Sequence, residues 1–169
     1  MKSIIKIFTL AIIALGFSTV SFAQVSATAN ASGTIVTPIA ITKTVDLNFG
    51  NIAVGSTAGT VVLAPAGTRT ATGGVTLPAT TGTVSAAEFN VTGQAGYTFS
   101  ITLPSTPTTV TSGANSMTVD TFTSTPTPTG TLTGGAQTVK VGATINVGAN
   151  QAAGTYTSAT PFTVTVNYN

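Results

Sequence analysis

The last ten residues of the chain alternate apolar and polar side chains. The apolar positions are Phe162, Val164, Val166 and Tyr168. Successive side chains of a β-strand point to opposite faces, so this pattern predicts a strand over residues 161–168 with one apolar face. Such a terminal strand either closes a sandwich or forms one half of an intermolecular joint.

Short alternating runs separated by Gly, Pro and Ser recur along the chain, and no useful helical period follows residue 23. We expect strands at 25–31, 34–44, 45–49, 60–64, 75–77, 88–92, 97–103, 117–122, 138–147 and 161–168. Residues 88–92 and 97–103 form the clearest hairpin. The stretches 67–74, 104–113 and 123–135 are expected to be loops. This order predicts an all-β fold, an immunoglobulin-like β-sandwich, complete in itself or lacking its last strand and completed by a donor strand.

The N-terminus has the pattern of a secretory signal. Lys2 and Lys6 precede an apolar run at 7–17, and Ser21-Phe22-Ala23 offers small residues where a signal peptidase reads them. We therefore predict a signal peptide at 1–23, an N-terminal extension at 24–33 and a sandwich domain at 34–169. An uncleaved anchor is the alternative, but the run is short for a membrane span. The chain is expected to be exported, through the periplasm to the cell surface or beyond, with no membrane span after cleavage.

The charges of the exported part balance. Without Lys2 and Lys6, the basic residues are Lys43, Arg69 and Lys140, and the acidic ones are Asp46, Glu88 and Asp120. Nucleic-acid binding needs clustered Lys and Arg, so the composition argues against it. A neutral surface also offers little electrostatic resistance to self-association.

The residues that most catalytic sites need are missing. The chain has no His and no Cys, which removes Ser-His-Asp and Cys-His arrangements and the usual zinc sites. Glu88 and Asp120 could meet across a sheet as a glycosidase pair, but isolated solvated carboxylates are the better interpretation. We predict a non-enzymatic protein without cofactor or metal.

A second alternating segment lies at 24–33. Its small apolar face consists of Val25, Ala27, Ala29, Ala31 and Gly33. If the sandwich lacks its last strand, this segment from a neighbouring copy can fill the gap by β-augmentation. Head-to-tail filling does not close on itself, so it makes a fibre. Burying Ala in place of Val or Leu forgoes roughly 1–3 kcal/mol per pocket, which predicts a weaker joint than larger side chains would make.

Two families resemble this chain. Residues 153–169, with a glycine, an alternating final strand and a penultimate tyrosine, resemble the end of chaperone–usher pilus subunits, although the disulfide of many such subunits is absent. The resemblance implies that Phe162, Val164, Val166 and Tyr168 line an assembly groove. It also implies a periplasmic chaperone and an outer-membrane usher as partners, besides further copies or related subunits. The motifs at 46–50, 89–93, 97–101 and 141–148 resemble the bacterial exported family called domain of unknown function 4402, itself similar to fimbrial subunits.

The sequence thus predicts a structural subunit of a surface fibre, pilus or adhesive coat. A self-contained secreted sandwich that binds a surface glycan or protein is the alternative. A small outer-membrane barrel is a third interpretation, but the aromatic residues are too few for two girdles.

Overall fold

A computed structural model describes residues 23–169, which divide into two units: the residues before Ile35, and the body Ile35–Asn169. The predicted signal peptide lies outside the described residues, apart from Ala23. Residues 23–39 contain no strand, so the strand predicted at 25–31 is absent from the structure. A single strand of small side chains has no partner to supply hydrogen bonds, and isolated strands are not stable in water.

The body is all-β, as predicted. Its strands are β1 (Ala40–Val45), β2 (Asn48–Phe49), β3 (Ala53–Leu63), β4 (Arg69–Thr76), β5 (Val84–Ser85), β6 (Ala87–Thr92), β7 (Thr98–Thr102), β8 (Thr108–Ser112), β9 (Asn115–Thr125), β10 (Thr129–Thr131), β11 (Ala136–Val147), β12 (Thr157–Ser158) and β13 (Thr165–Tyr168). One 3₁₀ turn, η1 (Thr133–Gly135), precedes β11. No helix of the described residues is long and apolar enough to cross a membrane.

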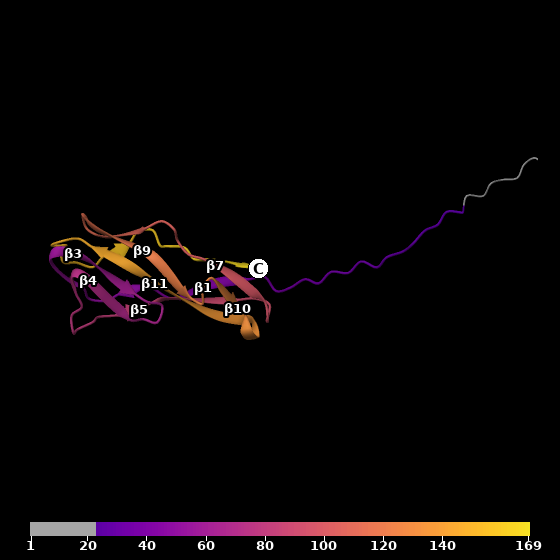
Figure 1. Ribbon diagram of the computed structural model, residues 1–169, viewed down its shortest axis with the longest axis horizontal. Helices are drawn as coiled ribbons and strands as arrows, with labels where there is room; N and C mark the ends of the chain where they lie inside the picture. The colour runs from indigo at the N-terminus through magenta and orange to yellow at the C-terminus, as the bar shows by residue number, and fades with distance from the viewer. Residues whose placement is uncertain (1–22) are drawn as a thin grey trace, which may run out of the picture. The chain divides into compact units, whose positions relative to one another are not determined.

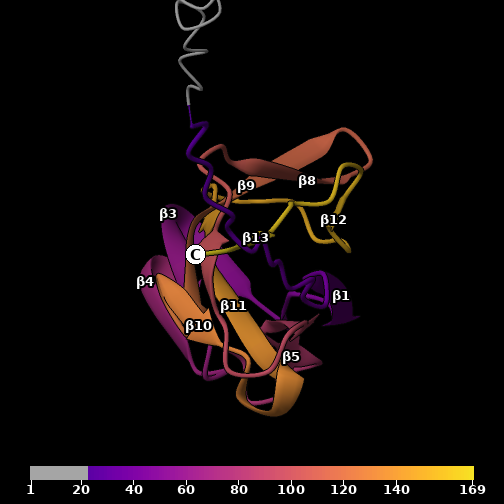
Figure 2. The same ribbon diagram turned by 90° about the vertical axis from the view of Figure 1, so that its right-hand side faces the viewer.

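The strands form two main antiparallel sheets. The larger has the order β1-β6-β11-β9-β8-β12, with the β3–β4 hairpin attached to β11 through β3. The smaller has the order β10-β7-β13, and β2 pairs with β5. Figure 1 shows β3 and β4 at one end of the body and β7 and β10 at the other, and Figure 2 shows the β8–β9 hairpin with β12 beside β8.

The connectivity is that of an immunoglobulin-type sandwich. In that fold strands A, B, E and D make one sheet, and C, F and G make the other. In order across the larger sheet β1, β6, β11 and β9 occupy the places of A, B, E and D, and in the smaller sheet β7 and β13 occupy those of C and F. Within residues 23–169 no strand occupies the place of G beside β13.

Two hydrophobic clusters make up the core, and β11 contributes to both. Cluster 1 lies under β6, β7 and β13 and consists of Ala87, Phe89, Val91, Phe99, Leu132, Val139, Val141, Val164 and Val166. Cluster 2 lies under β3 and β4 and consists of Phe49, Val61, Leu63, Val75, Val119, Ala143, Ile145 and Val147. The first half of β11 pairs with β6 and the second half with β3, so one strand carries both clusters.

The predicted hairpin of 88–92 and 97–103 is wrong. Both strands exist, but β6 pairs with β1 and β11 whereas β7 pairs with β10 and β13. Phe89 and Val91 of β6 and Phe99 of β7 all belong to cluster 1. The two strands therefore lie in different sheets and share a core, and their short connection crosses from one sheet to the other.

Three predicted loops contain strands. Residues 67–74 overlap β4, 104–113 contain β8, and 123–135 contain β10. These stretches are rich in Thr and Gly, a composition that favoured the loop prediction. Pairing with neighbouring strands nevertheless makes part of each stretch a strand.

Candidate assembly site

Strand β13 has a hydrogen-bonded neighbour on one side only. It pairs with β7, with Thr165 opposite Thr102 and Tyr168 opposite Phe99. Its other side has no paired strand among residues 23–169. This free side, which we call the β13 edge, is the first candidate for a site.

The register shows which backbone groups face the β13 edge. The Asn169 N–H donates to the Thr98 carbonyl at 3.2 Å, and the Ile101 N–H donates away from β13 to the Pro128 carbonyl at 2.9 Å. Residues of an antiparallel strand alternate between bonding one neighbour and the other. Thr165 and Asn167 therefore bond β7, and the N–H and C=O groups of Val166 and Tyr168 point to the β13 edge.

Three other strands with one paired neighbour, β4, β1 and β12, carry features that oppose strand addition, and β13 does not share their charges or bulges. β4 begins with Arg69 and pairs with β3 through a register shift. β1 holds Lys43 and also has an irregular register, whereas β12 has only two residues. Charges, bulges and short length are the usual protections of sheet edges. β13 has no charge, no proline and a regular register.

The four residues predicted to line an assembly groove share one face, and that face is the core face. Val164 and Val166 are 7% and 8% exposed and belong to cluster 1. Phe162 and Tyr168 are half-buried and pack against the same cluster. The Phe162 ring lies 6.3 Å from Phe89 and 4.9 Å from Phe122, centroid to centroid. These side chains extend the core up to the β13 edge, and their part in assembly stays a prediction.

The Tyr168 hydroxyl joins three distant segments of the body. It donates to the Thr37 carbonyl at 2.7 Å and accepts from the Gln94 N–H at 2.6 Å. The Tyr168 ring meets Tyr97 edge-on at 5.6 Å, and a Cβ on Gly93 would overlap the hydroxyl. Sequence reasoning missed this arrangement. The penultimate tyrosine was a visible signal, but nothing in the sequence indicated partners so far away along the chain.

The predicted donor face lies on the N-terminal extension. Its residues, Val25, Ala27, Ala29, Ala31 and Gly33, are all exposed, and Val25 is 93% exposed. None of residues 24–33 is part of a strand in the structure. These residues present an uncharged chain of small side chains.

The carboxylates do not form a catalytic pair. Glu88 of β6 binds Lys140 at 2.7 Å, and Asp120 of β9 accepts from the Asn146 amide at 2.8 Å. β6 and β9 flank β11 on opposite sides, which separates them by roughly 10 Å before any offset along the strands. No cluster of three metal-ligating side chains occurs among the described residues.

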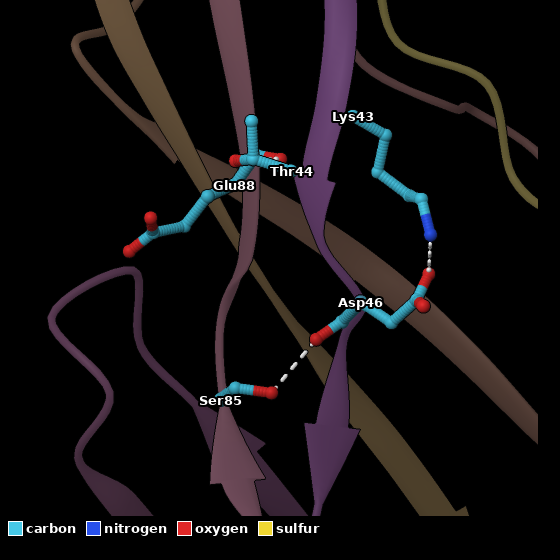
Figure 3. A network of polar contacts seen from close by, with 5 residues as sticks. All are labelled: Lys43, Thr44, Asp46, Ser85 and Glu88. Carbon is cyan, nitrogen blue, oxygen red and sulfur yellow. Dashed lines mark hydrogen bonds and ion pairs between the residues drawn. The ribbon is translucent and has the colours of Figure 1, made fainter.

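The remaining acidic residue, Asp46, helps to hold β1 against the β5–β6 segment. Its carboxylate binds Lys43 at 2.6 Å, and its carbonyl accepts from the Ser85 hydroxyl at 2.7 Å (Figure 3). The Thr44 hydroxyl donates to the Glu88 carbonyl at 3.1 Å. In Figure 3 the Glu88 carboxylate points away from Lys43 and Asp46. The network therefore consists of connections between strands and leaves no convergent acid–base pair.

A groove of about 620 Å³ lies between the segment after β7 and the segment before β13. Leu103 and Phe162 supply apolar walls, and no lining residue is charged. The other lining residues are Pro104, Ser105, Thr106, Pro107, Thr108, Thr109, Thr111, Ala159, Thr160, Pro161 and Thr163. The volume is that of a typical small-ligand site, and sequence reasoning did not identify it.

Residues 39–168 match the family described as Domain of unknown function (DUF4402). The chain belongs to this family. The match covers the body from just before β1 to the end of β13, so the β13 edge is part of what the DUF4402 domain includes. Neither the curated proteins nor the solved structures include a significant match.

Proposed function

We propose that this DUF4402 protein is a non-enzymatic, exported structural subunit of a surface fibre, pilus or adhesive coat. Its subunits assemble by strand addition, in which residues 24–33 of one copy, or of a related subunit, pair with the β13 edge of the next. The observation that carries the proposal is that β13 has an unprotected edge and that a core-facing row of apolar side chains, Phe162, Val164, Val166 and Tyr168, runs along residues 162–168, the last two of them in β13 itself.

The chemistry of the two surfaces is compatible. Residues 24–33 and 159–169 contain no charged side chain, so pairing brings no like charges together. The backbone groups of Val166 and Tyr168 supply hydrogen bonds, each worth about 0.5–1.5 kcal/mol net. Specificity comes from alternate side chains of the added strand that face the core. Because most of these are alanine, the joint gains its strength mainly from the main chain.

Export makes transient protection of this edge necessary, since an exposed strand edge pairs with other chains. We therefore propose a periplasmic chaperone that covers the β13 edge and an outer-membrane usher that receives the subunit, as in the pilus subunits that the C-terminal segment resembles. The chaperone would contact the β13 edge before the next subunit does.

The first test is light scattering with size-exclusion chromatography on residues 24–169, followed by negative-stain microscopy. We expect fibres or a ladder of oligomers from this chain, and folded monomers after deletion of 24–33. Polymers of unchanged length from the deletion variant would contradict the proposal.

A matched pair of substitutions sharpens this test. Ala29→Asp places a charge on the predicted donor face, and Thr28→Asp places the same charge on the opposite face. We expect Ala29→Asp to shorten the oligomers at least about tenfold in number-average length, because an unpaired carboxylate would enter the core. Thr28→Asp should have little effect. Equal effects of the two variants would argue that the extension does not present one face.

A second candidate function is a self-contained binding domain, and the 620 Å³ groove is the observation that favours it. Its neutral lining of hydroxyls and apolar walls suits an uncharged ligand such as a glycan. This function predicts a stable monomer of residues 24–169 that retains its groove ligand after deletion of 24–33.

A further inference from the structure

The Tyr168 hydroxyl is fully used by main-chain groups. It donates to the Thr37 carbonyl and accepts from the Gln94 N–H, at 2.7 and 2.6 Å. Gln94 completes the ring of contacts, because its side-chain oxygen accepts from the Thr37 N–H at 3.3 Å and from the Thr37 hydroxyl at 3.4 Å. Thr37 is therefore held by three hydrogen bonds, one from Tyr168 and two to the Gln94 side chain, although it lies outside every strand.

We infer that Tyr168 is a positioning residue, which fixes the point where the N-terminal extension leaves the body. Thr37 precedes Pro38, and the next residue that packs against the core is Ile39 of the same segment. Thr37 belongs to no ladder, and its backbone contacts run to Tyr168 and Gln94. Without the Tyr168 hydroxyl only the two longer bonds to the Gln94 side chain, at 3.3 and 3.4 Å, hold Thr37, so we expect the firmly anchored part of the chain to begin at Ile39.

The anchor sets the length of the tether between subunits; this step rests on the proposed function. The predicted donor face ends at Gly33, so three residues, 34–36, connect it to the anchored Thr37. They span about 10 Å at most. With Ile39 as the first anchored residue, the tether is residues 34–38 and spans about 17 Å. A longer tether gives neighbouring subunits more freedom, so Tyr168 should stiffen the fibre.

The chain offers a matched control for the hydroxyl. Tyr168→Phe keeps the ring that packs on cluster 1 and meets Tyr97, and it removes only the bonds to Thr37 and Gln94. Tyr97→Phe removes a neighbouring hydroxyl that takes no part in these bonds. Tyr97 is 44% exposed, so loss of its hydroxyl should disturb little.

The anchor is tested on the folded monomer by amide hydrogen exchange. In Tyr168→Phe we expect the amides of Gln94 and Thr37 to exchange at least about tenfold faster, with the amides of β6 and β11 unchanged. Tyr97→Phe should leave all four regions as they are. Gln94→Ala removes the acceptor of Thr37 but keeps the Gln94 N–H, so only the Thr37 amide should respond. Unchanged exchange at Gln94 and Thr37 in Tyr168→Phe would overturn the inference.

Fibre stiffness tests the consequence. Fibres of Tyr168→Phe should bend more sharply in negative stain than those of Tyr97→Phe, under conditions in which both subunits are fully folded. If exchange at Gln94 and Thr37 becomes faster in Tyr168→Phe but no variant forms fibres, Tyr168 anchors Thr37 and the proposed function is wrong. If fibres form and the amides do not respond, the proposed function stands and the anchor fails.

Discussion

Strands β4 and β13 both border a sheet, but only β4 carries protection against a further strand. β4 covers cluster 2, starts with a positively charged residue and has an irregular register with β3. β13 covers cluster 1 with a regular register and no charge. The cores behind the two strands are built from the same kinds of side chain. The two edges therefore differ in the residues at the edge and not in the kind of core behind them, which is why we propose β13 as the assembly site.

The largest predicted effects come from substitutions in the two clusters of the core. We expect such substitutions to destabilise the fold by similar amounts in both clusters. Phe99 of cluster 1 and Leu63 of cluster 2 are both fully buried. Phe99→Ala should destabilise the fold by about 3–5 kcal/mol and Leu63→Ala by about 2–5 kcal/mol. Urea unfolding of the monomeric deletion variant measures both. A much smaller loss of stability in Phe99→Ala would show that cluster 1 is loosely packed. The β4 and β13 edges would then differ in the packing of the cores behind them as well as in their protective residues.

The second prediction removes protection from β4. Arg69 donates from Nη1 to the Phe49 carbonyl at 2.6 Å and to the Asn51 carbonyl at 2.9 Å. Arg69→Met keeps much of the stem but loses the charge and both bonds, at a cost of about 1–3 kcal/mol. We expect the variant to associate through β4 at high concentration, as sedimentation velocity would reveal. A variant that is destabilised yet strictly monomeric would show that Arg69 protects nothing.

The third prediction resolves the β13 edge residue by residue. In the monomer the amides of Val166 and Tyr168 should exchange at least about tenfold faster than that of Asn167, which bonds β7. Addition of a synthetic peptide with the sequence of residues 24–33 should slow exchange at Val166 and Tyr168 and leave Asn167 unchanged. Uniform protection along β13 before any peptide is added would mean that the edge is already covered.

The smallest predicted effect concerns the surface ion pair of Lys140 and Glu88, whose side chains are 49% and 31% exposed. Lys140→Ala should cost less than about 1 kcal/mol, because solvent screens such pairs. The loss should shrink as salt is added. A salt-independent loss above that value would assign Lys140 a packing role through its stem.

The sequence predicted the fold class because alternation is a local property. The patterns at 88–92 and 138–147 correspond closely to β6 and β11, since both strands have one clear core face. Pairing partners are not local, which is why the hairpin prediction failed: Phe89 and Phe99 meet across the core and lie in different sheets. Most of β4 and all of β8 were missed, because the Thr and Gly residues of β4 and the Thr residues of β8 show little apolar pattern.

The candidate site was predictable in part for the same reason. The face shared by Val164 and Val166 follows from the sequence, and the structure places that face on the core. The Tyr168 contacts with Thr37 and Gln94 arise only when the segment before β1, the turn after β6 and the end of β13 come together. These three segments are far apart in the chain, so no local sequence pattern includes them all.

Strand β11 has a consequence for the time course of folding. It pairs with β3 and β6 on one side and with β9 on the other, and all three precede it in the chain. Neither core can close until residues 136–147 are available, so early folding lacks the strand that joins its parts. Such long-range pairing is intrinsically slow, on the order of milliseconds to seconds. During that interval the edges of β3, β6 and β9 that later pair with β11 are unpaired, so we expect pairing with other chains to be the main hazard while the protein folds.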